Sequence, residues 1–308
     1  MNTNKELIKK VDTFVSDLDG GELIGDQAAA FIQDAVDAAV LQKFCRTVTI
    51  PNGKRTIPRM GFGTRILRAA TEGQALPEAQ RAKVDIDSIT LEPMPFVATV
   101  RLTYEAMEKN IEKWGVENSI KKAMAQRIGI DVDDLVMNSN TASLDPFYKH
   151  FNGMRALAGG GIDLAGAAYG KDVMKEMMKT LPKAFKNDRS ALAYFASLSS
   201  AENYQDELSG RATTLGDKYL EGSAPMYFNG ARVIDSSVIP EDLGIAPNFR
   251  TEAILCDPRN AIVAYKENVT FETDKDIEAR LWIIVATIWV TFGFEQPAGA
   301  VRGWNIGL

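Results

Sequence analysis

A histidine-dependent reaction in this chain would have to use His150, because the sequence contains a single histidine. Serine and cysteine nucleophiles need a neighbouring imidazole as their general base. The residues around His150 are Tyr148, Lys149 and Phe151, and they supply no oxyanion-hole pattern. The sequence therefore predicts a structural or solvent-facing histidine and no catalytic residue.

The two cysteines offer little chemistry either. Cys45 and Cys256 lie far apart in the sequence, and neither belongs to a Cys-x-x-Cys motif. A disulfide framework or a zinc site would need paired or closely spaced cysteines. We expect two small thiols that are buried or half-buried.

Two further motifs resemble ligand sites only in part. The glycines at 159–161 are not followed by the Gly-Lys-Ser/Thr of a phosphate-binding loop, which indicates a flexible connector. The carboxylates Asp131, Asp133 and Asp134 lack the spacing of a calcium loop, so we expect a solvated helix face. No metal and no cofactor is predicted.

Charge is unevenly distributed along the chain. Between Arg46 and Lys83 the sequence holds eight basic and two acidic residues, a local charge of +6, while the whole chain carries −6. Residues 1–45 hold four lysines and eight carboxylates, or −4, and residues 84–308 sum to −8. A basic segment on an acidic body favours self-association between copies.

The composition, 45% hydrophobic and 25% charged in 308 residues, is that of a soluble protein with a sizeable core. The longest apolar run, Leu281–Val290, is interrupted only by Thr287 and falls short of the roughly 20 residues that cross a bilayer. The first residues lack the apolar stretch and cleavage site of a secretory signal. We therefore expect a protein made in a cytosol, without a membrane partner.

A two-stranded excursion is predicted in the basic segment. Two β-like runs, TVTI and RTIPRM, flank Pro51-Asn52-Gly53, where Asn-Gly favours a tight hairpin. The return run, Ala82–Leu91, alternates polar and apolar residues as a half-exposed strand does. Such a ribbon is marginal in water by itself, so we expect it to lie against a neighbouring subunit.

A long helix and a long strand should form much of the core. The segment Val116–Asn138 carries apolar residues at every fourth position, which predicts an amphipathic helix of about 35 Å. The segment Ala279–Phe292 is apolar on both faces and is expected to be a central strand, with Trp282 and Ile284 buried.

Three pairs of stretches carry a resemblance to a known family. They are Thr71-Glu72-Gly73 before Ile86–Leu91, Leu102-Thr103-Tyr104-Glu105 before Asp134–Asn138, and Ala253–Pro258 before Ala261–Tyr265. With these stretches in this order, the chain resembles the major capsid proteins of tailed bacteriophages. Their Johnson fold is shared with herpesvirus floor domains and encapsulin shells. The resemblance covers nearly the whole chain and implies an α+β fold.

The resemblance also implies a division of the chain into four parts. These are an N-terminal arm (1–45), an extended β-loop (46–95), a peripheral domain with a spine helix at 116–138 (96–149 and 251–308), and an axial domain (150–250) around the hexamer and pentamer axes.

Inter-subunit contacts are expected from the loop and the arm. The loop residues are Arg55, Arg59, Arg65, Arg68 and Glu72, and the arm residues are Asp17, Asp19, Glu22 and Asp26. Some relatives join subunits by an isopeptide bond from a loop lysine to an asparagine. Lys54 and Lys83 are the candidate lysines, but no motif marks an acceptor, so crosslinking is not predicted.

The implied function is that of a major capsid protein without enzymatic activity. Copies would assemble in the host bacterial cytoplasm into hexamers and pentamers of an icosahedral or prolate head shell that encloses double-stranded DNA. The implied partners are a portal protein, a separate scaffolding protein, a decoration protein, and packaged DNA through non-specific contact.

Two alternatives stay open at this point. An encapsulin-like compartment would have the same fold but protein cargo, and a test of purified particles for DNA would separate the two. A soluble cytosolic enzyme would be a monodisperse monomer that turns over a small molecule.

Overall fold

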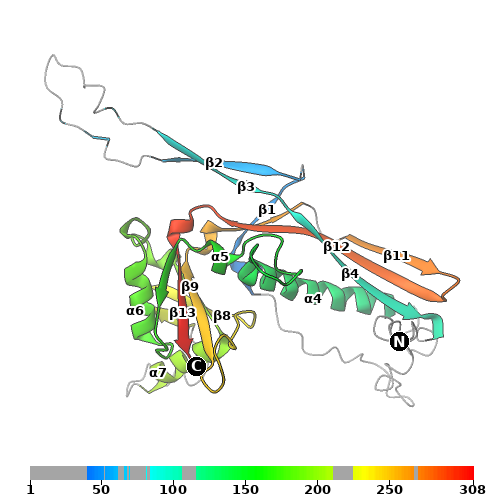
Figure 1. Ribbon diagram of the computed structural model, residues 1–308. Coiled ribbons are helices and arrows are strands. Elements are labelled where there is room, and N and C mark those ends of the chain that lie inside the picture. Colours follow the sequence, from blue (N-terminus) through cyan, green and yellow to red (C-terminus); the bar gives the residue numbers. More distant parts are fainter. Residues whose placement is uncertain are drawn as a thin grey trace.

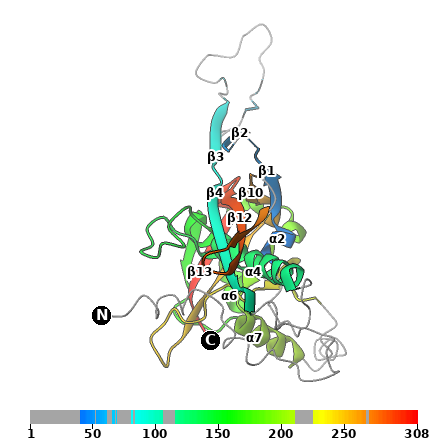
Figure 2. The same cartoon turned by 90° about the vertical axis from the view of Figure 1, so that its right-hand side faces the viewer.

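The computed structural model describes residues 40–51, 53–61, 66–67, 69, 81, 84–105, 116–210, 225–266 and 270–308. These residues form two lobes and a projecting ribbon (Figure 1). One lobe, called the wing, is elongated, and the other, called the compact lobe, carries the C-terminus. The ribbon leaves the end of the wing that adjoins the compact lobe, and it points away from both lobes in the side view of Figure 2.

The wing is built on a five-stranded sheet whose central member is β12 (Leu281–Phe294). Strand β4 (Met94–Thr103) pairs antiparallel with β12 along one side. Along the other side, β12 pairs with β11 (Thr270–Asp276) and then with β10 (Ala261–Tyr265). The central position expected for this strand is confirmed, with bounds of 281–294 in place of 279–292.

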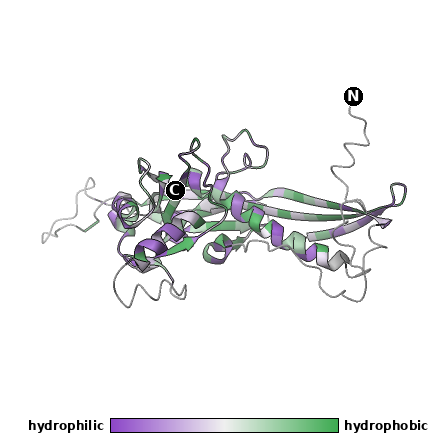
Figure 3. Ribbon diagram, turned by 90° about the horizontal axis from the view of Figure 1, so that it is seen from below, coloured by the Kyte–Doolittle hydropathy of each residue, from purple (hydrophilic) through white to green (hydrophobic). Residues whose placement is uncertain are grey.

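Helix α4 (Val116–Asn138) packs on one face of the wing sheet and has the bounds that the sequence predicts. Its residues Met124, Ile128, Val132 and Val136 are buried and follow the predicted spacing of four. Figure 3 shows α4 beneath the strands, with hydrophobic and hydrophilic residues alternating around the helix. Among the described residues, no helix is both long and apolar enough to cross a membrane.

The compact lobe is built on a six-stranded mixed sheet in the order β5-β13-β9-β6-β8-β7. Its strands are β5 (Gly160–Asp163), β6 (Ala193–Ala196), β7 (Tyr227–Phe228), β8 (Ala231–Asp235), β9 (Arg250–Cys256) and β13 (Ala300–Gly307). Helices α6 (Lys171–Thr180) and α7 (Leu198–Ser209) bury Met177 and Tyr204 against this sheet. The remaining short helices are α5 (Met154–Leu157) and 3-10 turns at Lys183–Phe185, Arg189–Ala191, Pro258–Asn260 and Pro297–Gly299.

The segment 251–308 is divided between the two lobes, although the resemblance implies that it belongs to one domain. Strands β9 and β13 pair with each other in the compact lobe, whereas β10, β11 and β12 belong to the wing. Strand β12 is therefore followed by a further strand, β13. The apolar pattern of a strand shows that it is buried but does not show which sheet it joins.

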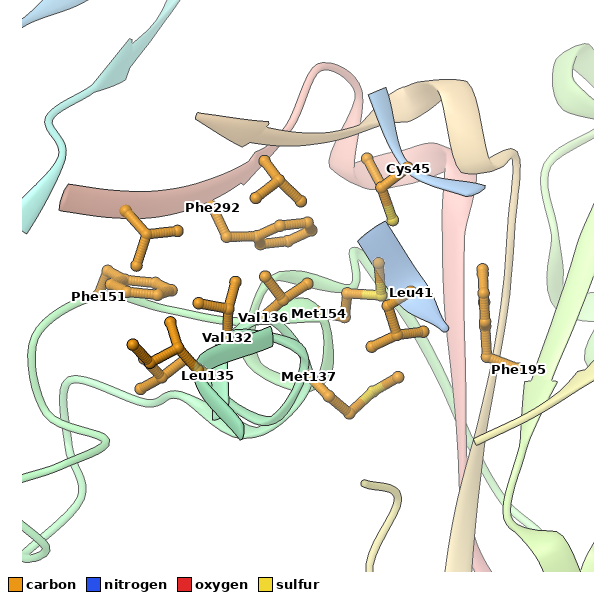
Figure 4. Close-up of a cluster of buried hydrophobic side chains, with 14 of the residues drawn as sticks. Leu41, Cys45, Val132, Leu135, Val136, Met137, Phe151, Met154, Phe195 and Phe292 are labelled. Atoms are coloured by element: carbon orange, nitrogen blue, oxygen red, sulfur yellow. The ribbon is translucent and has the colours of Figure 1, made fainter. Parts of the chain in front are cut away.

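A continuous core connects the lobes. Figure 4 shows Leu41 of α2 (Leu41–Phe44) between Val136 of α4 and Phe195 of β6, with Phe292 of β12 above Val136. These side chains are at most 4% exposed and belong to one cluster. Because their burial requires both lobes, we expect the wing and the compact lobe to fold as one cooperative unit.

The ribbon consists of β2 (Arg55–Gly61) and β3 (Asp85–Leu91), so the predicted two-stranded excursion is confirmed. The predicted hairpin between the TVTI and RTIPRM runs is wrong, because β1 (Arg46–Thr49) pairs in parallel with β10. Gly53 does turn the chain, with φ of +75°. Ile50, just before this turn, is buried against Ile262 of β10, which directs β1 into the wing and away from β2.

Candidate self-association surfaces

The inner face of the ribbon is attached to its own chain. Cross-strand partners in an antiparallel pair share a face, so Ile57 and Ile89 lie on the same side as Leu91. These residues pack against Ile262 and Ala264 of β10. The contact fixes the base of the ribbon on the wing.

The outer face of the ribbon presents an apolar pair to solvent. Met60 and Ile86 lie directly opposite each other, and they are 74% and 71% exposed. Pro58 precedes them on the same face and is also exposed. An exposed apolar pair on a ribbon that projects from the body is a candidate contact with another protein.

The basic residues described on the ribbon are engaged partly within their own chain. Arg59 donates to Asp87 at 2.7 Å and to the backbone oxygen of Glu295 at 3.2 Å. Lys54 lies 3.8 Å from Glu92, and Arg55 is exposed. Outside the described residues lie the predicted contact residues Arg65, Arg68, Glu72, Asp17, Asp19, Glu22 and Asp26, and the candidate crosslink lysine Lys83.

The wing has one face away from α4, and an apolar row runs along it. The row follows β12 through Ile283, Val285 and Trp289, which are half-buried, and it continues on β4 at Val97, which is 63% exposed. On β11, the acidic residues Glu272 and Asp274 lie opposite Val285 and Ile283 and are exposed. This surface, called the outer wing face, is an apolar row with acidic residues along β11. Basic residues adjoin the same row: Arg101 of β4 lies opposite Ile283, and Lys266 Nζ lies 4.3 Å from the centre of the Trp289 ring.

Asp133 is buried, so the expectation of a solvated aspartate is wrong at this position. Its carboxylate accepts N–H bonds from Val40, Leu41 and Gln42 at 2.5, 2.9 and 3.2 Å. Burial raises the pKa of Asp133 although these bonds act in the opposite direction. The residue fixes the start of α2 on α4, and its role required a partner 92 residues away that sequence periodicity does not reveal.

The other two aspartates of this group are also paired. Asp131 forms an ion pair with Arg127 at 3.0 Å, and Asp134 accepts a bond from the Tyr148 hydroxyl at 2.7 Å. Across the part of the chain that the structure describes, no group of three or more His, Cys, Asp or Glu residues is arranged to hold a metal.

A buried ionic network joins α4 and α5 to the compact lobe. Glu252 of β9 is 4% exposed and accepts bonds from Arg155 at 2.7 Å and from Arg302 at 2.6 and 2.7 Å. Arg155 also donates to Asn138, the last residue of α4, at 2.9 Å. Burial alone would raise the pKa of Glu252, but the two guanidinium groups hold it below its usual value. This cluster, called the junction network, was missed because its members lie far apart in sequence.

The residues first considered for chemistry have structural environments. His150 is exposed and its ring lies 5.3 Å from that of Phe96, as expected for a solvent-facing histidine. Cys45 and Cys256 are free and buried, as expected, and burial raises the pKa of the Cys45 thiol to about 12. The flexible connector expected at 159–161 is wrong at its second and third residues, because β5 begins at Gly160 and pairs with β13.

Comparisons with known proteins place this arrangement among shell proteins. No family model matches the chain. The chain is 30% identical over 303 residues to the putative prophage capsid protein YqbE of Bacillus subtilis (strain 168), and the match covers 97% of each sequence.

Solved structures show the same fold at much lower identity. The capsid of a native GTA particle has a TM-score of 0.66 and 16% identity, with 95% of this chain and 98% of that chain covered. Gordonia phage Cozz gives a TM-score of 0.65 and 14% identity, with 94% and 93% covered. The holo-SrpI encapsulin complex from Synechococcus elongatus PCC 7942 gives a TM-score of 0.64 and 10% identity, with 96% of each covered.

Proposed function

The chain belongs to the HK97-fold family of phage and prophage major capsid proteins, and from that premise we propose how its copies contact one another. It is a structural protein without enzymatic activity, and it forms the head shell of a phage or prophage particle. The contact we propose places the ribbon of one subunit on the outer wing face of the next.

Shape and polarity support this contact. The outer face of the ribbon exposes an apolar pair, Met60 and Ile86, near its far end, and the outer wing face offers a row of half-buried apolar residues. Joining these two surfaces removes apolar area from water, at about 25 cal/mol per Å². A two-stranded ribbon is marginally stable by itself, and this contact gives it a surface to pack against.

Charge supports this arrangement along β11, where the predicted contact residues Arg65 and Arg68 would add positive charge. Arg55 is exposed as well, but the register places it on the inner face of the ribbon with Ile57. Glu272 and Asp274 border the apolar row of the outer wing face. Complementary charge of this kind fixes register and partner choice more than it adds affinity.

We propose the division into domains and the remaining partners from the resemblance to phage major capsid proteins. The wing corresponds to a peripheral domain with α4 as its spine, the compact lobe to an axial domain around hexamer and pentamer axes, and residues 1–45 to an arm that reaches a neighbour. With the strand pairing described above, the axial domain would include β9 and β13 as well as the predicted 150–250. A portal, a scaffolding protein, a decoration protein and non-specific DNA contact complete the proposed partners.

The ribbon contact is tested by replacing its apolar pair. The double variant Met60→Asp/Ile86→Asp should give a folded subunit whose shell yield falls at least tenfold, because both charges would be buried at every contact. The control Met60→Leu/Ile86→Leu keeps the apolar surface and should assemble normally. Wild-type yield from the aspartate variant, counted by electron microscopy of purified protein, would remove the proposed contact.

The alternative of an encapsulin-like compartment shares the fold but predicts different contents. The prophage relative, similar over almost its full length, favours a shell that holds DNA. Nuclease-protected DNA in particles isolated after induction of the phage supports the head shell, whereas protein cargo alone would favour the compartment.

A further inference from the structure

We propose that Asn229 is a site of spontaneous deamidation, a covalent modification that needs no enzyme. The site is the two-residue turn Asn229-Gly230 between β7 and β8. The proposal goes beyond the shell-forming function and does not depend on it. It is carried by a comparison of two identical tripeptides, because Phe-Asn-Gly occurs both at 151–153 and at 228–230.

Deamidation begins when a backbone nitrogen attacks the side-chain amide of the preceding asparagine. Here Gly230 N bonds to Asn229 Cγ while the Cγ–Nδ2 bond breaks. The side-chain nitrogen leaves as ammonia and takes the proton of the attacking N–H. Water then opens the cyclic imide. Opening at Cγ gives aspartate, whereas opening at the backbone carbonyl gives isoaspartate, in which the main chain runs through Cγ.

The turn at Asn229 leaves the attacking nitrogen accessible. Asn229 and Gly230 are exposed, and their φ angles of +52° and +92° are those of a tight hairpin turn. Among the described residues, none accepts a hydrogen bond from Gly230 N. A Cβ built at Gly230 would meet only Arg189 Cβ, at 3.5 Å. Glycine has no Cβ to hinder the attack, and water reaches this turn freely.

The same tripeptide is protected at Asn152. Gly153 is buried, and its N–H donates to Ser139 O at 2.8 Å, so the attacking nitrogen is already engaged. A Cβ built at Gly153 would lie 2.6 Å from Val136 O of α4, which shows how closely the backbone is packed. Cyclisation at Asn152 would have to break the hydrogen bond and displace this backbone.

The side-chain oxygens do not distinguish the two sites. Asn152 Oδ1 accepts a bond from Thr141 N at 2.9 Å, and Asn229 Oδ1 accepts one from Arg189 Nη1 at 3.2 Å. The difference lies in the two glycine nitrogens, of which one is buried and bonded and the other is exposed and open. The structure therefore favours reaction at Asn229.

Either product changes the edge of the compact lobe. Aspartate at position 229 places a carboxylate beside Arg189 and turns the present hydrogen bond into an ion pair. Isoaspartate adds a backbone atom to a turn of two residues, whose flanking residues Phe228 and Ala231 are paired. Turn length fixes the register of a hairpin, and β7 has two residues in all, so the longer turn should release it from the sheet.

Peptide mapping by mass spectrometry measures both sites in one sample. The purified, folded chain is kept at mildly alkaline pH, and the amide and acid forms of each Phe-Asn-Gly peptide are quantified over time. Because Gly153 N must first lose its hydrogen bond, deamidation at Asn229 should be at least about tenfold faster than at Asn152. In denaturant the two sites should react at similar rates, since the tripeptides are identical.

A longer side chain at the same position provides the control. Asn229→Gln cannot form the five-membered imide, so its peptide should stay unmodified while Asn152 behaves as in the wild type. Equal rates at the two asparagines of the folded chain, or faster reaction at Asn152, would overturn the proposal. An Asn229 that stays intact in the folded chain and reacts only in denaturant would overturn it as well.

Discussion

The ribbon and the junction network each contain a pair of an arginine and a carboxylate, which is exposed in the ribbon and buried in the junction network. In the ribbon, Arg59 and Asp87 pair at 2.7 Å while their side chains stay 34% and 65% exposed. In the junction network, Arg155 and Glu252 pair at the same distance, with side chains 19% and 6% exposed. Exposed pairs contribute up to about 1 kcal/mol, whereas breaking a buried pair costs about 3–5 kcal/mol. The junction network therefore contributes more to the stability of the subunit than the exposed ribbon pair does, and we expect the outer part of the ribbon to be stabilised by another subunit.

The largest expected effect follows from removing the buried carboxylate. Glu252→Ala leaves Arg155 and Arg302 without their shared partner and should lower the free energy of unfolding by about 3–5 kcal/mol. Chemical denaturation of unassembled subunits measures it, with Glu295→Ala, at the exposed pair with Arg46, as the control. Equal losses in the two variants would erase the distinction between buried and exposed ion pairs.

Substitution in the core of the wing should lower the free energy of unfolding by nearly as much. Ile284 is fully buried, so Ile284→Ala should cost about 2–5 kcal/mol. Trp282, expected to be buried, is only half-buried, and its ring carries Lys275 Nζ at 4.2 Å from its centre. Trp282→Ala should therefore leave a soluble, folded subunit with a smaller loss, as thermal unfolding would report; an insoluble product would restore the sequence-based expectation.

Acid should weaken the junction network. The pKa of Glu252 is lower in the folded state than its ordinary 4.5, so its contribution to stability is present above that value and is lost as pH falls through the folded pKa. Glu252→Gln lacks this contribution. The free energies of unfolding of the wild type and the variant should converge as pH is lowered from 6 to about 3, and a constant difference across this range would contradict the assignment.

The smallest effect is expected at the ribbon. Arg59→Ala removes an exposed pair and should change the free energy of unfolding of the isolated subunit by less than about 1 kcal/mol. Denaturation of unassembled subunits again provides the measurement. A loss comparable to that of Glu252→Ala would show that the ribbon stabilises its own chain.

The sequence predicted the positions of helices and strands better than it predicted which strands pair and which side chains meet. The spacing of Met124, Ile128 and Val132 was sufficient to place α4, because burial of one helical face leaves a period of about four. The predicted pairing partner of β1 was wrong, because the alternation of polar and apolar residues in a strand is the same whichever strand pairs with it. Asp133 and Glu252 were not recognised as buried for a related reason: their partners come from distant parts of the chain.

The close approach of Leu91 to Gly293 makes the direction of the ribbon sensitive to small changes at its base. A Cβ atom added at Gly293 would meet Leu91 Cδ2 at 2.7 Å, so β12 touches the base of β3 where only a glycine fits without adjustment. Six paired residues of β3 beyond this contact, Asp85–Thr90, extend about 20 Å at 3.3 Å per residue. A small tilt at the base therefore displaces the far end of the ribbon by a larger distance. The absence of a side chain at Gly293 permits the close contact that helps to set the direction of the ribbon.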